Sequence, residues 1–443
     1  MPMLATIGGG SARGFGFGAG IAGYWQGGEI TETIVRPTAN GGNTPYYGTS
    51  VDLNEDGTYA IVGATLNTVG WTYIYSISGN TFTQQAAING GSGSGSYQNG
   101  DTFGDAVAIS GDGAVAVIGA PGHDININLL NAGDAYVFER NGSTWSERMR
   151  IRQLSSSDQD LNDYYGNAVD IDQDGTFVVV GSARDRGNDG ASTPGNGAIY
   201  ARGPWVPGSG YGQVKLTASD GSLGDSFGYD LAISGNGSYI IVGSPLKEVS
   251  GLGIAGCVYI YERTGSSFSG ATETIIDNPV PASSDYFGRS VDINYDGTWA
   301  AIGGYGDDDA ASGAGAVFVY KRTGSSWTQQ AKLVADDAAA NDGLGVSTGG
   351  IQISNDGTKI AVGAWGDDPG GAAYIFERTG ESWKQTRKLT ASDATAGDQY
   401  AHGLQGGVSI SDDGETVLIG ASREDGGAGD PTFNRGCVYH YTK

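Results

Sequence analysis

The chain has 443 residues, a formal net charge of −25 and 79 glycines. Such an excess of acidic residues argues against nucleic-acid binding, which depends on basic side chains that displace counterions from phosphates. No apolar run approaches the roughly 20 residues of a membrane-spanning helix, so we expect no membrane insertion. The first residues show no secretory signal, but processing of a precursor would remove one, and secretion stays open.

One sequence pattern recurs seven times along the chain. Its clearest copy, FGDAVAISGDGAVAVIGAP, covers 103–121. Each copy has an aromatic-Gly step or its counterpart, an alternating apolar-polar run, a turn that usually ends in Asp-Gly, and a short apolar run closed by glycine. The turn glycines are Gly57, Gly113, Gly175, Gly237, Gly297, Gly357 and Gly414. Their regular spacing indicates a repeat architecture.

Four strands are predicted within each copy. The alternating run, as at 290–294, is typical of a strand with two unlike faces, and the all-apolar run of a strand buried on both faces. An aromatic-rich run such as 134–140 then precedes a Gly-containing turn and a fourth run, as expected for a hairpin. Seven such units predict an all-β, seven-bladed β-propeller of four-stranded blades.

The two ends of the repeat array predict how the ring closes. The last copy stops after its third strand, whereas the segment 29–37 precedes the first copy in the register of a fourth strand. We predict that this segment pairs with 439–441 and completes the last blade, which leaves no exposed edge. The alternative is an open solenoid with two bare edges. The predicted domains are a tail, 1–28, and the propeller, 29–443.

The copies resemble the FG-GAP repeat, the propeller repeat of integrin α chains and many bacterial proteins. The resemblance rests on the aromatic-Gly step and on the GAP-like end of the second strand, as in Gly119-Ala120-Pro121. It implies the propeller fold but no single function, because propellers serve many. Integrin-like members carry a calcium loop between the first two strands. Here that turn is too short to supply the about 6–8 oxygens that calcium prefers, so we expect no calcium there and no other metal or cofactor.

Aspartates also precede the aromatic-Gly step, and we interpret them as turn caps whose carboxylates accept backbone N–H bonds. They are Asp101, Asp163, Asp225, Asp285, Asp342 and Asp398. Cys257 and Cys437 occupy the same third-strand position in units nearly opposite on the ring, which favours small core residues over a disulfide. The three histidines belong to no nucleophile signature, and we expect a protein that is not an enzyme.

Because neighbouring strands alternate in direction, the loops separate into two faces. The turns between first and second strands and between third and fourth strands are short, and we call their side the short-turn face. The longer connections between second and third strands, and from one blade to the next, form the long-loop face. The tail is expected to leave from the short-turn face.

The tail is rich in glycine, and we predict that its apolar side chains anchor the chain in a larger assembly. These anchor residues are Leu4, Ile7, Phe15, Phe17, Tyr24 and Trp25. The alternative is a tail that folds back on its own propeller. The tail sequence IGGGSARGFGFGAG resembles the N-terminal sequence of structural proteins of marine and cyanobacterial tailed phages.

These features together predict a virion structural or adhesion protein, present in several copies as a tail, fibre or capsid-decoration component. The tail would bind other virion proteins, and the long loops would contact a host-surface glycan or protein. Candidate contact residues are Tyr97, Tyr305, Asp307, Asp308, Trp365 and Asp367, since aromatic faces suit sugar rings. One alternative is an extracellular, integrin-like adhesin or matrix protein of a cell. Another is a propeller polysaccharide lyase or glycosidase.

Overall fold

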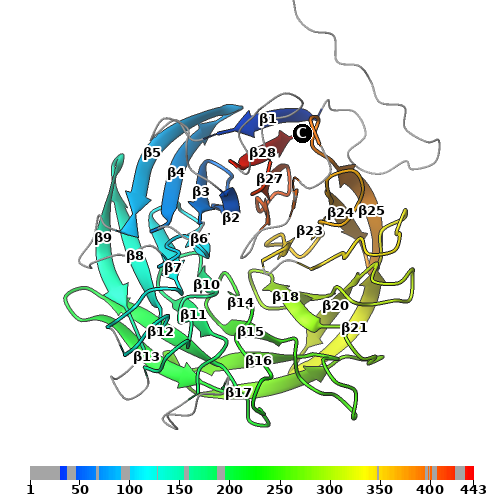
Figure 1. Cartoon of the computed structure of the whole chain (residues 1–443), viewed down its shortest axis with the longest axis horizontal. Helices are drawn as coiled ribbons and strands as arrows, with labels where there is room; N and C mark the ends of the chain where they lie inside the picture. The colour runs from blue at the N-terminus through cyan, green and yellow to red at the C-terminus, as the bar shows by residue number, and fades with distance from the viewer. Residues whose placement is uncertain are drawn as a thin grey trace, which may run out of the picture.

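The computed structural model describes residues 30–36, 46–65, 69–90, 100–126, 128–153, 159–186, 195–346, 349–394, 398, 400–401, 407–424 and 435–443. Within these ranges the chain forms seven four-stranded antiparallel sheets that stand as blades around a central axis (Figure 1). The predicted seven-bladed propeller is thus confirmed. No helix of the described residues is long and apolar enough to cross a membrane.

Each blade runs from an inner strand at the axis to an outer strand at the rim, and blades are numbered by the chain order of their inner strands. The inner strands are β2 (Tyr47–Leu53), β6 (Val107–Ile109), β10 (Val169–Ile171), β14 (Leu231–Ile233), β18 (Phe287–Ile293), β22 (Ile351–Ile353) and β26 (Val408–Ile410). The second strands are β3 (Tyr59–Ala64), β7 (Val115–Ala120), β11 (Val178–Ser182), β15 (Tyr239–Ser244), β19 (Trp299–Gly304), β23 (Lys359–Ala364) and β27 (Thr416–Ala421).

The outer half of each blade is a hairpin. The third strands are β4 (Trp71–Ser78), β8 (Asp134–Asn141), β12 (Ala198–Val206), β16 (Cys257–Thr264), β20 (Ala316–Thr323), β24 (Ala372–Thr379) and β28 (Cys437–Thr442). The outer strands are β5 (Thr81–Asn89), β9 (Thr144–Ile151), β13 (Gly210–Leu216), β17 (Ser267–Asp277), β21 (Ser326–Leu333), β25 (Ser382–Leu389) and β1 (Thr31–Val35).

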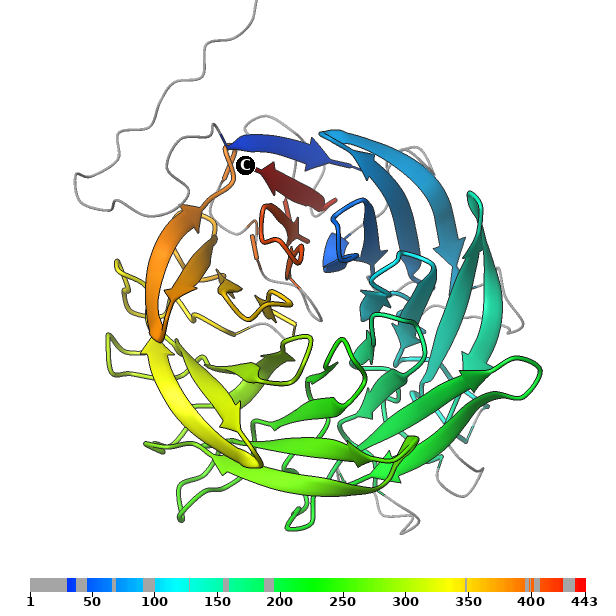
Figure 2. The ribbon, with the colours of Figure 1, turned by 180° about the vertical axis from the view of Figure 1, so that it is seen from behind.

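The ring closes as predicted, through the earliest described strand. β1 pairs antiparallel with β28, in a register that runs from Thr31 opposite Thr442 to Val35 opposite Val438. Figure 2 shows β1 completing the blade that holds β26, β27 and β28. The outer edge of the last blade is thereby paired, which removes an edge open to another chain.

Two glycines of each repeat allow neighbouring blades to touch through their backbones. A Cβ at Gly119, which ends a second strand, would lie 2.1 Å from the carbonyl oxygen of Gly166, the step glycine of the next blade. Gly420 meets Gly48 at the same distance across the closure. A side chain at these positions would force the blades apart, which explains the recurring glycines. In the last blade the step is Tyr400-Ala401, and Ala401 takes a positive φ of 57°.

The core lies between blades rather than at one centre. Each cluster of buried apolar side chains joins two neighbouring sheets, as where Val117 of β7 packs with Val180 of β11 and Tyr200 of β12. Cys257 and Cys437 are both free and buried in such clusters. Their predicted role as small core residues is confirmed.

An arginine at the end of the third strand stabilises the short-turn face at four of the seven blade junctions. Arg322, for example, donates from Nε to Gly297 O at 2.7 Å and from Nη1 to Gly324 O at 3.0 Å. Its guanidinium carbon lies 4.4 Å from the ring centroid of Tyr239 in the preceding blade. Arg140, Arg263 and Arg378 repeat this arrangement over Tyr59, Phe177 and Trp299. We call these four side chains the arginine clamps.

The clamps occur where the second strand of the preceding blade begins with an aromatic residue or, in blade 3, directly follows one, Phe177. The other three junctions begin with Val115, Lys359 or Thr416. At the junction after Val115, Tyr211 takes over the contact and donates its hydroxyl to Gly175 O at 3.0 Å. The short-turn face is therefore held by side chains that bridge its turns and leave little loop free.

Candidate functional site on the long-loop face

Four of the six aspartates before the aromatic-Gly step cap turns of the long-loop face in the described structure, as predicted. The Asp285 carboxylate accepts the N–H of Ala282 at 2.6 Å, and Asp342 accepts that of Ala339 at 2.6 Å. Asp163 and Asp225 accept the equivalent bonds from Asp160 and Ser222. These hydrogen bonds stabilise the conformation of the loops and occupy the carboxylates.

A second set of acids, in the loops between second and third strands, is bound to lysines of the outer strands. Asp185 Oδ1 lies 2.8 Å from Lys215 Nζ, and its Oδ2 accepts the hydroxyl of Tyr200 at 2.5 Å. The corresponding lysine pairs are Asp307 with Lys332 and Asp367 with Lys388. In blade 7 Glu424 pairs instead with Arg36, an arginine that directly follows β1. In blade 4 the loop carries Lys247 instead, which lies 3.3 Å from Asp220 and 3.5 Å from Asp225 in the connection between β13 and β14.

Sequence reasoning missed these ion pairs, and two of the predicted contact residues belong to them. Asp307 and Asp367 are 7% and 5% exposed, with lysine nitrogens at 2.6 and 2.7 Å. Instead of facing outward, their carboxylates tie loops to outer strands. The repeat did contain a signal, because an acid recurs four residues after the second-strand glycine and a lysine recurs before the last leucine of the fourth run.

Blade 2 replaces this pair by a buried network around His123. The His123 Nδ1 atom lies 3.0 Å from Asp101 Oδ2, and its Nε2 lies 3.3 Å from Asp134 Oδ2. Asp134 is fully buried and also pairs with Arg150 and Arg152. The network resembles an acid–base dyad, but the hydrogen bonds of His123 go to charged neighbours, with no serine or cysteine nucleophile among them. Its role in the described structure is to join a loop to two strands.

The central channel is lined by side chains of the inner strands that bond to the next blade. Asp52 Oδ2 accepts the N–H of Ile109 at 2.9 Å, and Asp170 Oδ2 accepts that of Ile233 at 2.7 Å. Asp292, Gln352 and Ser409 make the same bond, the last to Leu53 of the first blade. The equivalent positions in blades 2 and 4 are Ala108 and Ala232, which have no acceptor. The channel acids are thus ties between blades.

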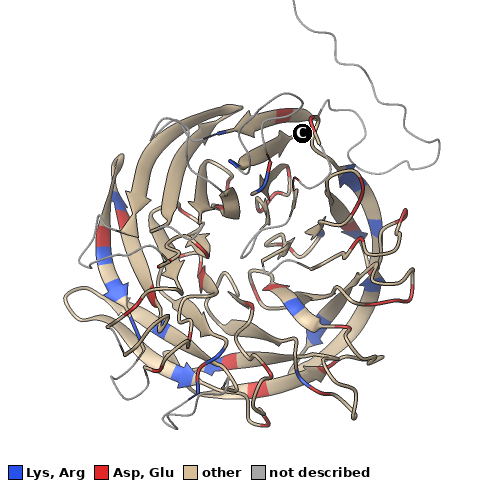
Figure 3. Ribbon diagram, in the orientation of Figure 1, with Lys and Arg blue, Asp and Glu red and all other residues tan. Residues whose placement is uncertain are grey.

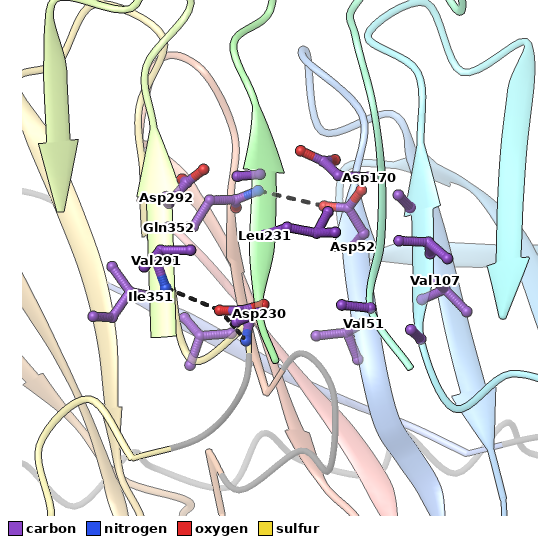
Figure 4. A pocket seen from close by; sticks show the side chains of 17 residues that line it. Val51, Asp52, Val107, Asp170, Asp230, Leu231, Val291, Asp292, Ile351 and Gln352 are labelled. Atoms are coloured by element: carbon purple, nitrogen blue, oxygen red, sulfur yellow. Dashed lines mark hydrogen bonds between the residues drawn. The ribbon is translucent and has the colours of Figure 1, made fainter. Parts of the chain in front are cut away.

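Burial shifts the titration of these channel carboxyls. It raises the pKa of Asp292 to about 8 and that of Asp52 to about 6, although backbone N–H bonds lower each. Asp230, which accepts N–H bonds from Val291 and Gly349, has its pKa raised by burial to about 7. Figure 4 shows these carboxyls around a cavity of about 100 Å³ on the axis. Within the described ranges no group of three or more His, Cys, Asp or Glu side chains is placed to hold a metal ion.

Two larger hollows lie farther out on the long-loop face, at blades 3 and 4. One of about 790 Å³ is lined by Asp185, Lys215 and neighbouring loop residues, and one of about 450 Å³ by Lys247 and its neighbours. Leu223 borders both hollows and is 67% exposed. This face therefore offers hollows with an apolar ridge between them.

Aromatic residues and arginines gather nearer the axis. The Tyr305 ring lies on that of Tyr286, with centroids 4.7 Å apart, and the Arg289 guanidinium lies over Tyr229 and Tyr305. Trp365, at the position of Tyr305 in the next blade, is 40% exposed. Arg184 over Tyr164 and Arg423 over Tyr46 form similar pairs in other blades. In Figure 3 most lysines and arginines lie on strands near the rim. Arg184 and Arg423 lie in loops, and Arg289 lies near the start of β18.

The remaining predicted contact residues are placed as follows. Tyr305 is partly buried, and Asp308 is exposed, with its Oδ1 accepting the N–H of Gly313 at 2.6 Å. Tyr97 and the six predicted anchor residues of the tail lie outside the described residues.

Comparison with known proteins identifies the repeat. A family model described as the FG-GAP repeat matches residues 94–138, 145–201, 212–261, 278–320, 327–376 and 383–441. Each match ends in a third strand. The sequence repeat therefore ends one strand before its blade does, as at the closure, where β1 supplies the outer strand of the last blade. No curated protein matches the chain.

Several solved structures are similar in fold. The β-propeller domain of Cps50 (Swd1) from Myceliophteria thermophila is 9% identical, with a TM-score of 0.52, and the match covers 87% of this chain and 95% of that one. A chain of the mitotic checkpoint complex is 12% identical, with a TM-score of 0.51 and coverage of 97% and 98%. A putative 6-phosphogluconolactonase from Bacteroides uniformis is 12% identical, with a TM-score of 0.52 and coverage of 82% and 89%. At these identities the similarity concerns the fold alone.

Proposed function

Because the chain belongs to the FG-GAP repeat family, we propose that it is a non-enzymatic recognition protein whose long-loop face binds a partner surface. The finer proposal is a structural or adhesion component of a virion, held there by its tail and directed toward a glycan on the host surface. Propellers of this kind present loops of varied sequence from a rigid ring, which suits recognition.

The distribution of exposed apolar side chains carries this proposal. Among the described residues, large exposed hydrophobic side chains in the long loops are Leu130, Leu161, Leu223, Val280 and Trp365. The short-turn face has Val206 and Tyr295. More of these exposed side chains lie on the long-loop face than on the short-turn face, which favours the long-loop face as the binding side.

An adhesion assay tests the binding face. Beads coated with the full chain are mixed with whole cells of marine cyanobacteria, and the bound beads are counted. We expect adhesion by the parent chain and at least a tenfold loss for the double variant Leu223→Ser/Val280→Ser. The matched control, Val206→Ser/Tyr295→Ser on the opposite face, should adhere like the parent. Equal adhesion by both variants, or none by the parent, would overturn the proposal.

The virion role has a separate test. A variant that lacks residues 1–25 should remain a folded propeller by circular dichroism but should no longer co-purify with reconstituted particles. Incorporation of this truncated chain at the parent level would refute the anchor. Incubation of the parent with polysaccharides should release no new reducing ends, and turnover would favour the lyase or glycosidase alternative.

A further inference from the structure

We propose that the long-loop side of the channel, at blades 4 to 6, binds the carboxylate-bearing sugars of an acidic glycan, with Arg289 as the carboxylate ligand. This inference rests on the proposed function and names its ligand class. The surface consists of Tyr229, Tyr286, Arg289, Tyr305 and Trp365, and we call it the acidic-sugar site.

The first observation is the state of Arg289. It follows the aromatic-Gly step of blade 5, and its Nε donates to Val346 O at 3.1 Å in blade 6. The guanidinium carbon lies 4.6 Å from the ring centroid of Tyr229 and 5.4 Å from that of Tyr305. Among the described residues its guanidinium forms no ion pair within 4.0 Å, although its charge lowers the pKa of the buried Asp230 carboxyl. The side chain is partly buried and lies over the two tyrosine rings.

That state is unusual for this chain, which has 49 acidic and 24 basic residues. Arg150 and Arg152 pair with Asp134, Arg36 pairs with Glu424, and the arginine clamps donate to turn carbonyls. A planar guanidinium without such a partner is well suited to bind a carboxylate with two parallel hydrogen bonds. The acidic surroundings would repel a polyanion elsewhere on the protein, so an anionic ligand needs such a position.

The second observation is the aromatic surface beside it. Tyr305 and Trp365 each stand two residues after the glycine of their second strand, in adjacent blades. The same position holds small residues or proline in the other blades: Thr65, Pro121, Ala183, Pro245 and Ser422. Aromatic rings in adjacent blades, one of them with the Arg289 guanidinium over it, suit a sugar chain that presents apolar ring faces and carboxylates in alternation.

The third observation extends the site around the ring. Arg184 and Arg423 are exposed in the loops after the second strands of blades 3 and 7, over Tyr164 and Tyr46. Neither forms an ion pair with another described residue. A polymer with repeated charges would find further arginines beyond Arg289, whereas a single sugar would use one. We therefore infer a polymer of uronic acids rather than a monosaccharide.

The test measures binding of the full chain to immobilised polygalacturonate and to the same polymer after its carboxyl groups have been reduced to alcohols. We expect the parent to bind the acidic form at least tenfold more tightly than the reduced form. Arg289→Gln should lose at least tenfold of the affinity for the acidic form and leave binding of the reduced form unchanged. Lys384→Gln, which removes one charge from the outer strand β25, should bind like the parent.

Several outcomes would overturn the inference. Equal binding of the two polymers by the parent chain would overturn it. This measurement needs no variant, so it stays decisive even if Arg289→Gln fails to fold. Unchanged affinity in a folded Arg289→Gln, shown by an unaltered melting curve, would overturn it as well. If cell adhesion persists while polygalacturonate is not bound, the ligand class is wrong and the proposed function stands. Binding to polygalacturonate without cell adhesion would refute the proposed function alone.

Discussion

The two faces of the propeller are formed by the same seven blades but are stabilised by different contacts. On the short-turn face, four arginine clamps bridge turns of nearly constant length and stack on the preceding blade. On the long-loop face, connections of varied length rest on ion pairs that differ from blade to blade, with His123 in blade 2 and a loop lysine, Lys247, in blade 4. The recurring contacts of the short-turn face maintain the ring. The contacts that differ most from blade to blade lie on the long-loop face, where we propose that a partner binds.

The largest effect should come from breaking the buried network under the loops of blade 2. Asp134→Ala leaves Arg150, Arg152 and His123 without their shared carboxylate. Removing one partner of a buried ion pair costs about 3–5 kcal/mol, so the free energy of unfolding in urea should fall by that order. Asp336→Ala, at an exposed loop acid, should change it by less than about 0.5 kcal/mol. A small loss in Asp134→Ala would mean that the long-loop face does not depend on its ion pairs.

A smaller effect is expected from the short-turn face. Arg322→Ala removes three hydrogen bonds to turn carbonyls and a stacking contact, and the free energy of unfolding should fall by about 1–2 kcal/mol. Lys384→Ala, on an outer strand, is the control and should be neutral. If Arg322→Ala is equally neutral in urea unfolding, the clamps are a by-product of the repeat rather than a support of it.

The smallest effect is a change in the pH dependence of stability, and it concerns the channel between the two faces. Because burial raises the pKa of Asp292 to about 8, the folded state binds its proton more tightly than the unfolded state. Its contribution to stability is therefore greatest at low pH and is lost as the pH rises from about 4 toward about 8. Asp52 and Asp230 act in the same direction. In Asp292→Asn the difference in melting temperature between pH 5 and pH 8 should shrink, whatever the variant's absolute stability, and an unchanged difference would contradict the assignment.

The sequence predicted the frame because each repeat carries the physical reasons for it. The glycines that let blades touch, the apolar second strands and the unmatched strand at 29–37 are all visible as a pattern. The turn-capping aspartates could also be predicted from the sequence, because their carboxylates accept a hydrogen bond from a backbone N–H only three residues earlier in the chain.

The site was less predictable because its contacts join different elements. Asp307 and Asp367 looked like surface acids, and only the three-dimensional arrangement brings Lys332 and Lys388 to them. Arg289 carries no signal in the sequence, because the rings that lie under its guanidinium, Tyr229 and Tyr305, come from other segments of the chain. Tyr305 and Trp365 could be singled out as aromatic residues in long loops, but their place in adjacent blades follows from the ring.

The pairing of β1 with β28 also sets the order of events during synthesis. A ribosome makes Thr31–Val35 early and their partner, Cys437–Thr442, about 400 residues later. Until Cys437–Thr442 has been made, β1 lacks the strand that it pairs with in the closed ring. Closure of the ring therefore depends on two segments that are separated by almost the whole propeller in sequence.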